Sequence, residues 1–208
     1  MSSMAPSVTP DPPPDDLPVI GRWARVLLSL ALIPLGRGAF RSEYGEVPLL
    51  SDLDLAVHEF GHILFSPFGE TMTVLGGSLT QVALPLVFAG YFLWAREGRR
   101  DVHAATVCLW WTSINVLGVA IYASDARHGQ MMLVNGQTGQ EGGPHDWTTL
   151  FSKWGVLDRG DVIATKMRGV AALLCVVSIA GGLLAAWRRG RARGQPALTN
   201  RSATESMQ

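Results

Sequence analysis

The sequence predicts an all-α protein, a polytopic membrane helix bundle with about five transmembrane helices and a short interfacial helix. Of its 208 residues, 48% are hydrophobic and 16% are charged, and the mean hydropathy is +0.21. Soluble domains carry roughly 25% charged residues, so this composition indicates a membrane protein whose main partner is the lipid bilayer. The net charge is zero. The chain therefore lacks the excess of basic residues that would indicate a nucleic-acid partner.

Five apolar stretches approach the roughly 20 residues that a helix needs to cross a bilayer. They cover residues 23–40, 49–68, 73–94, 104–124 and 170–187. The second stretch is the least apolar, and the fifth is the most continuous. The third contains Gly76, Gly77 and Pro85, which favour a broken or closely packed helix because small residues let helix backbones approach each other.

The membrane region is expected to form one domain, residues 21–190. The preceding residues 1–20 are rich in Pro and Asp and should form a disordered tail, because they contain too little apolar surface to pack. Residues 191–208 form a second polar tail. The long loop over residues 126–168 contains the segment 146–157, whose Trp and Phe residues fall on one side of a helix. A short amphipathic helix of this kind favours an interfacial position.

The most informative motif is His58-Glu59-Phe60-Gly61-His62, an H-E-x-x-H pattern inside the second apolar stretch. Residues four apart share one face of a helix, so His58 and His62 can present two imidazoles to one metal ion. Glu59 lies at the edge of that face, where its carboxylate can act as a general base. Charged and polar residues at this depth in a membrane mark functional sites. The spacing is that of a zinc site, so Zn²⁺ is the predicted cofactor.

A catalytic zinc ion usually has three protein ligands, and the motif supplies two. One predicted helix separates the motif helix from the fourth helix, so these two run in the same direction. His62 lies about six residues, roughly 9 Å, before the end of its helix. The third ligand is therefore expected where the fourth helix ends, and Asp125 is the predicted residue. His128, His145 and Asp146 are alternatives if the long loop folds back.

Structural roles compete with these assignments. Asp125 could mark the water-facing end of its helix, Asp146 has the default role of a helix N-cap, and His145 that of an exposed loop residue. Asp54 either solvates the start of the motif helix or orients a histidine as an acceptor. Gln81 is a single polar residue in an apolar helix, where a hydrogen bond to a neighbouring helix is the simplest role.

The motif and its surroundings resemble the site-2 protease group of intramembrane zinc metalloproteases (peptidase family M50, M50B-like branch). The segment His58-Glu59-Phe60-Gly61-His62 has the H-E-F-G-H form common in that family, and the run Gly76-Gly77-Ser78 is similar to the small-residue stretch after its first zinc helix. Asn115 and Asp125 resemble the family's Asn and Asp-Gly segment, although Ala126 stands in place of the glycine. The resemblance covers about residues 49–127.

The resemblance implies an integral-membrane zinc metalloendopeptidase that cleaves membrane-associated protein or peptide substrates. His58, His62 and Asp125 would be the metal ligands, and Glu59 the general base toward a zinc-activated water. The expected location is the cell membrane, as a multi-pass protein. The alternative is a non-proteolytic zinc-binding multi-pass membrane protein. A non-enzymatic membrane protein whose motif is accidental is a third reading. Substitution of Glu59 distinguishes the first two interpretations, because only the protease needs this carboxylate for activity. Bound zinc distinguishes both of them from the third, which predicts no metal.

Overall fold

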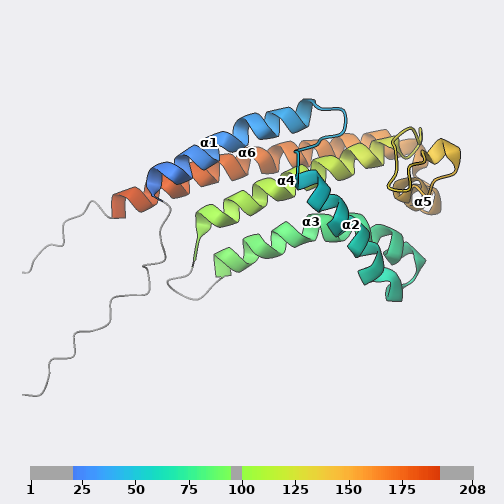
Figure 1. Cartoon of the computed structure of the whole chain (residues 1–208), viewed down its shortest axis with the longest axis horizontal. Helices are drawn as coiled ribbons and strands as arrows, with labels where there is room; N and C mark the ends of the chain where they lie inside the picture. The colour runs from blue at the N-terminus through green and yellow to red at the C-terminus, as the bar shows by residue number, and fades with distance from the viewer. Residues whose placement is uncertain (1–20, 95–99, 193–208) are drawn as a thin grey trace, which may run out of the picture.

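The computed structural model describes residues 21–94 and 100–192, which form helices and no strand. Four long helices run side by side along the longest axis of the molecule, and two short helices lie toward one end (Figure 1). The long helices are α1 (Arg22–Arg41), α3 (Glu70–Trp94), α4 (Val102–Asp125) and α6 (Gly160–Ala192), and the short ones are α2 (Leu50–Phe65) and α5 (Asp146–Lys153). Single 3-10 turns are η1 (Ser66–Phe68), η2 (Gly139–Glu141) and η3 (Leu157–Arg159). The all-α prediction is confirmed.

The long helices are the ones that can cross a membrane. In the part of the chain that the structure describes, four helices are long and apolar enough to do so, and they correspond to four of the five predicted stretches. The fifth, the motif helix α2, has only 16 residues. It is therefore about 24 Å long, shorter than the roughly 30 Å of a bilayer's hydrocarbon core. The prediction that this stretch spans the membrane as a full-length helix is therefore corrected to a helix that is too short to cross it.

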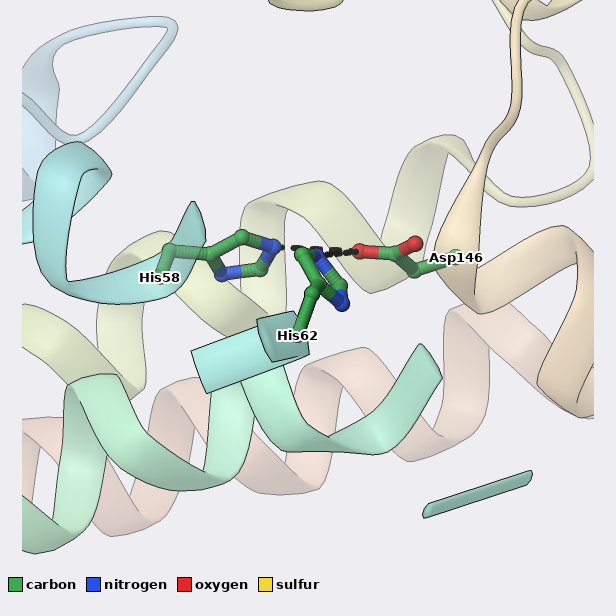
Figure 2. Close-up of side chains that lie close together, drawn as sticks. All are labelled: His58, His62 and Asp146. Carbon is green, nitrogen blue, oxygen red and sulfur yellow. Dashed lines mark hydrogen bonds and ion pairs between the residues drawn. The ribbon is translucent and has the colours of Figure 1, made fainter. Parts of the chain in front are cut away.

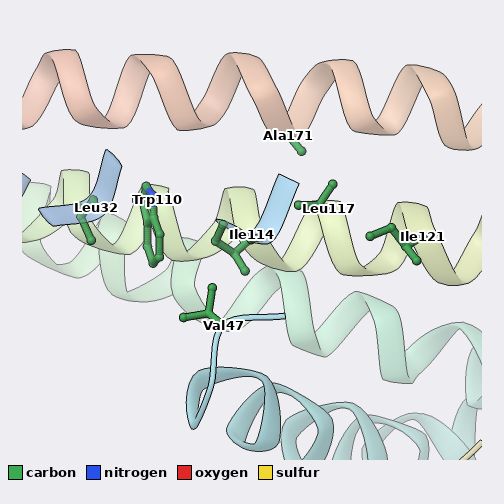
Figure 3. Close-up of a cluster of buried hydrophobic side chains, with 8 residues drawn as sticks. Leu32, Val47, Trp110, Ile114, Leu117, Ile121 and Ala171 are labelled. Atoms are coloured by element: carbon green, nitrogen blue, oxygen red, sulfur yellow. The ribbon is translucent and has the colours of Figure 1, made fainter. Parts of the chain in front are cut away.

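The segment over residues 42–65, which includes α2, enters the bundle and leaves at the same end. After α1, the chain turns back so that Val47 packs against the middle of α4 (Figure 3). Asp54, in the first turns of α2, accepts a hydrogen bond from Trp111, also near the middle of α4. His62, two turns later, contacts the first turn of α3. We call residues 42–65 the re-entrant segment.

Irregular backbone within a membrane must have its polar groups satisfied by the protein. Two serines do this at the start of the re-entrant segment. The Ser51 hydroxyl accepts a hydrogen bond from the Val47 N–H at 2.9 Å, and the Ser51 N–H donates to the Val47 carbonyl at 2.9 Å. The Ser42 hydroxyl accepts from the Glu46 N–H at 3.1 Å. The chain can therefore reach the middle of the bundle without a full helix.

α4 is the centre of the bundle. Its buried side chains Trp110, Ile114, Leu117 and Ile121 pack between α1, α6 and the re-entrant segment (Figure 3). At the end of the bundle where α4 begins, the guanidinium of Arg25 donates two hydrogen bonds to the Asp101 carboxylate, at 2.8 and 2.9 Å. This pair connects the start of α1 to the start of α4.

α2 and α3 cross with their backbones in contact. A Cβ atom on Gly61 would lie 2.3 Å from the Gly76 carbonyl oxygen, and one on Gly76 would lie 2.6 Å from the Gly61 carbonyl oxygen. Glycine is therefore required on both helices. Packing of this kind replaces the hydrophobic driving force that helices lack in lipid, and it places the motif helix directly on α3.

The predicted interfacial helix exists as α5, but its apolar face is turned toward the protein. Trp147, Leu150 and Phe151 are buried against α3, α4 and α6, and only Trp154, just after the helix, is substantially exposed. α5 is therefore a helix packed on the end of the bundle, and its position at a membrane interface stays a prediction. The predicted tail over residues 1–20 and most of the second tail, residues 193–208, lie outside the described residues.

Candidate metal centre

The structure brings His58 and His62 together with Asp146, the first residue of α5 (Figure 2). Asp146 Oδ2 lies 3.0 Å from His58 Nε2 and 3.3 Å from His62 Nε2. One potential ligand atom from each of the three residues lies within 4.8 Å of the others. The cluster is mostly shielded from solvent, because the three side chains are 9%, 23% and 15% exposed, in that order.

Both imidazoles are held by their other ring nitrogen. His62 Nδ1 lies 2.8 Å from the backbone carbonyl oxygen of Thr73, which can only accept, so this nitrogen carries the proton. His58 Nδ1 lies 3.0 Å from Gln81 Oε1 and donates to it in the same way. A neutral imidazole protonated at Nδ1 has its lone pair on Nε2. An outer hydrogen bond of this type is what fixes metal-ligating histidines in proteins.

Three potential electron-pair donors therefore face one another, an arrangement that either a metal cation or a proton shared between Asp146 Oδ2 and the His58 Nε2 atom can stabilise. Zinc bonds to His nitrogen and carboxylate oxygen are about 2.0–2.2 Å long, so ligands of a tetrahedral site are separated by roughly 3.3 Å. The observed separations between Asp146 Oδ2 and the two Nε2 atoms, 3.0 and 3.3 Å, are close to that value. The residues present fit a zinc ion with two histidine ligands and one carboxylate ligand.

Gly77 leaves the space that the two imidazoles occupy. A Cβ atom at this position would lie 2.6 Å from His58 Nε2 and 2.7 Å from His62 Nε2. Thr73, Gly77 and Gln81 are spaced four residues apart on α3, so they form one stripe on a helix face. In this stripe, Thr73 and Gln81 supply the hydrogen-bond acceptors for His62 and His58, and Gly77 leaves room for the two imidazoles.

His145 and Tyr122 place Asp146. The structure corrects the sequence-based assignment of Asp146 as an N-cap, because His145 caps α5, its Nδ1 accepting from the Thr148 N–H at 3.3 Å. The Asp146 carboxylate is thus available to the two histidines. Its backbone N–H donates to the Tyr122 hydroxyl oxygen at 3.1 Å. His145 is buried and packs against the Tyr122 ring at a tilt of 34°, with centroids 4.3 Å apart, so the prediction of an exposed loop residue was wrong.

Asp125 does not join the cluster, and its predicted position beside the two histidines is corrected. Its carboxylate oxygens accept the backbone N–H groups of Gln130 and Met131, at 2.9 and 2.8 Å, and so order the loop that follows α4. Asp125 Oδ2 also lies 3.4 Å from His145 Nε2. Burial lowers the pKa of His145, and the Asp125 carboxylate opposes this shift. Asp125 supports the loop from which Asp146 projects.

Glu59 lines a cavity of about 790 Å³ beside the three-residue cluster. No hydrogen bond among the described residues occupies its carboxylate, and the side chain is exposed. Residues of α2 and of the chain before it, of α4 and of the loop after α4 line most of the rest of the cavity, including Asp54, Tyr122, Met132 and Val134. The cavity joins the cluster to the inner end of α2.

The remaining predicted residues have separate positions. Gln81 makes the expected bond to a neighbouring helix, and its partner is His58. Asp54 does not orient a histidine. Its Oδ1 instead accepts from Trp111 and Asn115 on α4. His128 is exposed and lines a different, smaller cavity. The four-residue spacing of Gln81 from Gly77 in the sequence could have indicated that both face the motif helix. No local sequence pattern, by contrast, favoured Asp146 over Asp125 as the third ligand.

Comparisons with protein families, with characterised proteins and with solved structures find no match to this chain.

Proposed function

We propose that this protein is an integral-membrane zinc endopeptidase that cleaves membrane protein or peptide substrates in the cell membrane. One observation carries the proposal. His58 Nε2, His62 Nε2 and Asp146 Oδ2 converge with their lone pairs inward, in the wall of a cavity that Glu59 also lines. A motif of this spacing supplies two zinc ligands and a general base in metalloproteases.

Each residue has a role in this reaction. Zinc, when bound, supplies a Lewis acid for the scissile carbonyl and lowers the pKa of the water it holds. His58, His62 and Asp146 bind and orient the ion, and Gln81 and the Thr73 carbonyl fix the two imidazoles. The Glu59 carboxylate takes a proton from the attacking water and returns it to the leaving amine.

The cavity is suited to an extended peptide. Its volume of about 790 Å³ lies within the range of roughly 300–1,000 Å³ for ligand-binding sites. A helical substrate must unwind locally to react, because helical carbonyls are occupied by hydrogen bonds. The re-entrant segment and the loop residues Met132 and Val134 border the cavity, so they can contact the unwound chain.

Glu59→Gln tests the proposal. The purified variant should bind about one zinc ion per chain, as the wild type does, and lose peptide cleavage, since the amide cannot accept the proton. The paired substitution His58→Ala/His62→Ala should lose the metal as well. Zinc is measured by atomic emission and cleavage with a quenched fluorescent peptide. A zinc-loaded wild type without cleavage of any peptide in a mixed library would favour the non-proteolytic alternative.

A further inference from the structure

A second buried carboxylate, Asp54, lines the same cavity. It lies on α2 one turn before His58, at the inner end of the re-entrant segment, and it is 5% exposed. Asp54, His58 and His62 are spaced four residues apart, so they form one stripe on the helix. The mechanism proposed above leaves Asp54 without a role.

The two oxygens of this carboxylate differ in their hydrogen bonding. Both hydrogen bonds that Asp54 accepts go to Oδ1, from Trp111 Nε1 at 2.7 Å and from Asn115 Nδ2 at 3.2 Å. Within the described ranges, Oδ2 has no hydrogen-bond partner, and it keeps some accessible surface. Because the residue lines the cavity, Oδ2 is the atom available to a ligand.

Asp54 also has no cationic partner. Among the residues that the structure describes, no Lys, Arg or His nitrogen lies within 4.0 Å of it. The carboxylate of Asp101, by contrast, is paired with Arg25 at 2.8 Å. A buried charge is expensive unless it is paired. Such a carboxyl group is protonated while it is unpaired, and a cationic group of a molecule that enters the cavity can pair with its ionised form.

We propose that Asp54 is a specificity-determining residue that binds a lysine or arginine side chain of the substrate. This inference rests on the proposed function. Asp54 lies six residues before the midpoint between His58 and His62, about 9 Å along the axis, which corresponds to roughly three residues of an extended chain. The preferred substrate therefore has a basic residue about three positions from the scissile bond, on the side toward the middle of the bundle.

Peptide binding to the zinc-loaded Glu59→Gln protein tests this without cleavage. A labelled apolar peptide carries one lysine, moved residue by residue, and each peptide has a twin with norleucine, which keeps the methylenes and removes the charge. Fluorescence anisotropy should show one register at which lysine binds at least tenfold more tightly than norleucine. Asp54→Asn in the same protein should reduce that ratio to about one, because the amide keeps an acceptor and loses the charge.

Two further variants complete the test. Asp158→Asn removes an exposed carboxylate outside the cavity and should leave the ratio unchanged. Asp54→Glu keeps the charge and should keep a lysine preference, which covers the case in which Asp54→Asn folds poorly. Equal binding of lysine and norleucine at every register, or a preference that survives in Asp54→Asn, overturns the proposal. Failure of the proposed function shows separately, as cleavage that persists in Glu59→Gln.

Discussion

Replacing Gly77 with alanine should remove the metal while leaving the helix intact. The new Cβ would lie 2.6 Å from His58 Nε2 and 2.7 Å from His62 Nε2. Ordinary contact begins at 3.4 Å, so the nearer imidazole must move by about 0.8 Å, the difference between these two distances. Metal sites tolerate errors of roughly 0.2 Å in ligand position. Since disturbing an outer partner alone weakens metal binding about 10–100-fold, we expect at least a 100-fold loss here, about 2.7 kcal/mol.

The helix itself should not suffer, because alanine is favoured over glycine in a helix by about 0.8–1.0 kcal/mol. Zinc affinity is measured by competition with a chromophoric chelator in detergent, and helix content by circular dichroism. Gly169→Ala is the matched control, since nothing lies within 4 Å of a Cβ built on this α6 glycine. Wild-type zinc affinity in Gly77→Ala, with helix content preserved, would refute the assignment of the two Nε2 atoms as ligands.

Two further predictions address the membrane topology and the third ligand. Single cysteines are placed at Trp23, Trp94 and Met132 in a background without the native cysteines, since all three side chains are exposed. An impermeant thiol reagent should label the cysteines at Trp23 and Trp94 from one side of the membrane and the cysteine at Met132 from the other side. If α2 were a full-length span, Trp23 and Met132 would instead lie on the same side. Asp146→Ala should lose zinc, whereas Asp125→Asn should weaken it about 10–100-fold through the loop it orders. Equal losses in both, measured with the same chelator, would contradict the roles assigned here.

The apolar stretches and the H-E-x-x-H spacing were predictable because each depends on residues close in the chain. Hydropathy over about 20 residues identifies a potential span, and a four-residue spacing fixes a shared helix face. The sequence therefore determined an all-α membrane protein and the facing of His58 and His62. It also isolated Gln81 as a polar residue in an apolar helix, which the structure pairs with His58.

Tertiary structure decided the rest. Whether α2 spans the membrane depends on its packing, since the contact of Gly61 with Gly76 and the contacts of the preceding residues with α4 make a helix shorter than a full span possible. The choice of Asp146 over Asp125 depends on how a long loop folds back, through the cap that His145 places on α5 and the bonds Asp125 makes to its own loop. The contact that results, between His58 and Asp146, joins residues 88 positions apart. Local pattern carries no information about such a contact, because loop closure over that distance costs only slightly more for one register than for another.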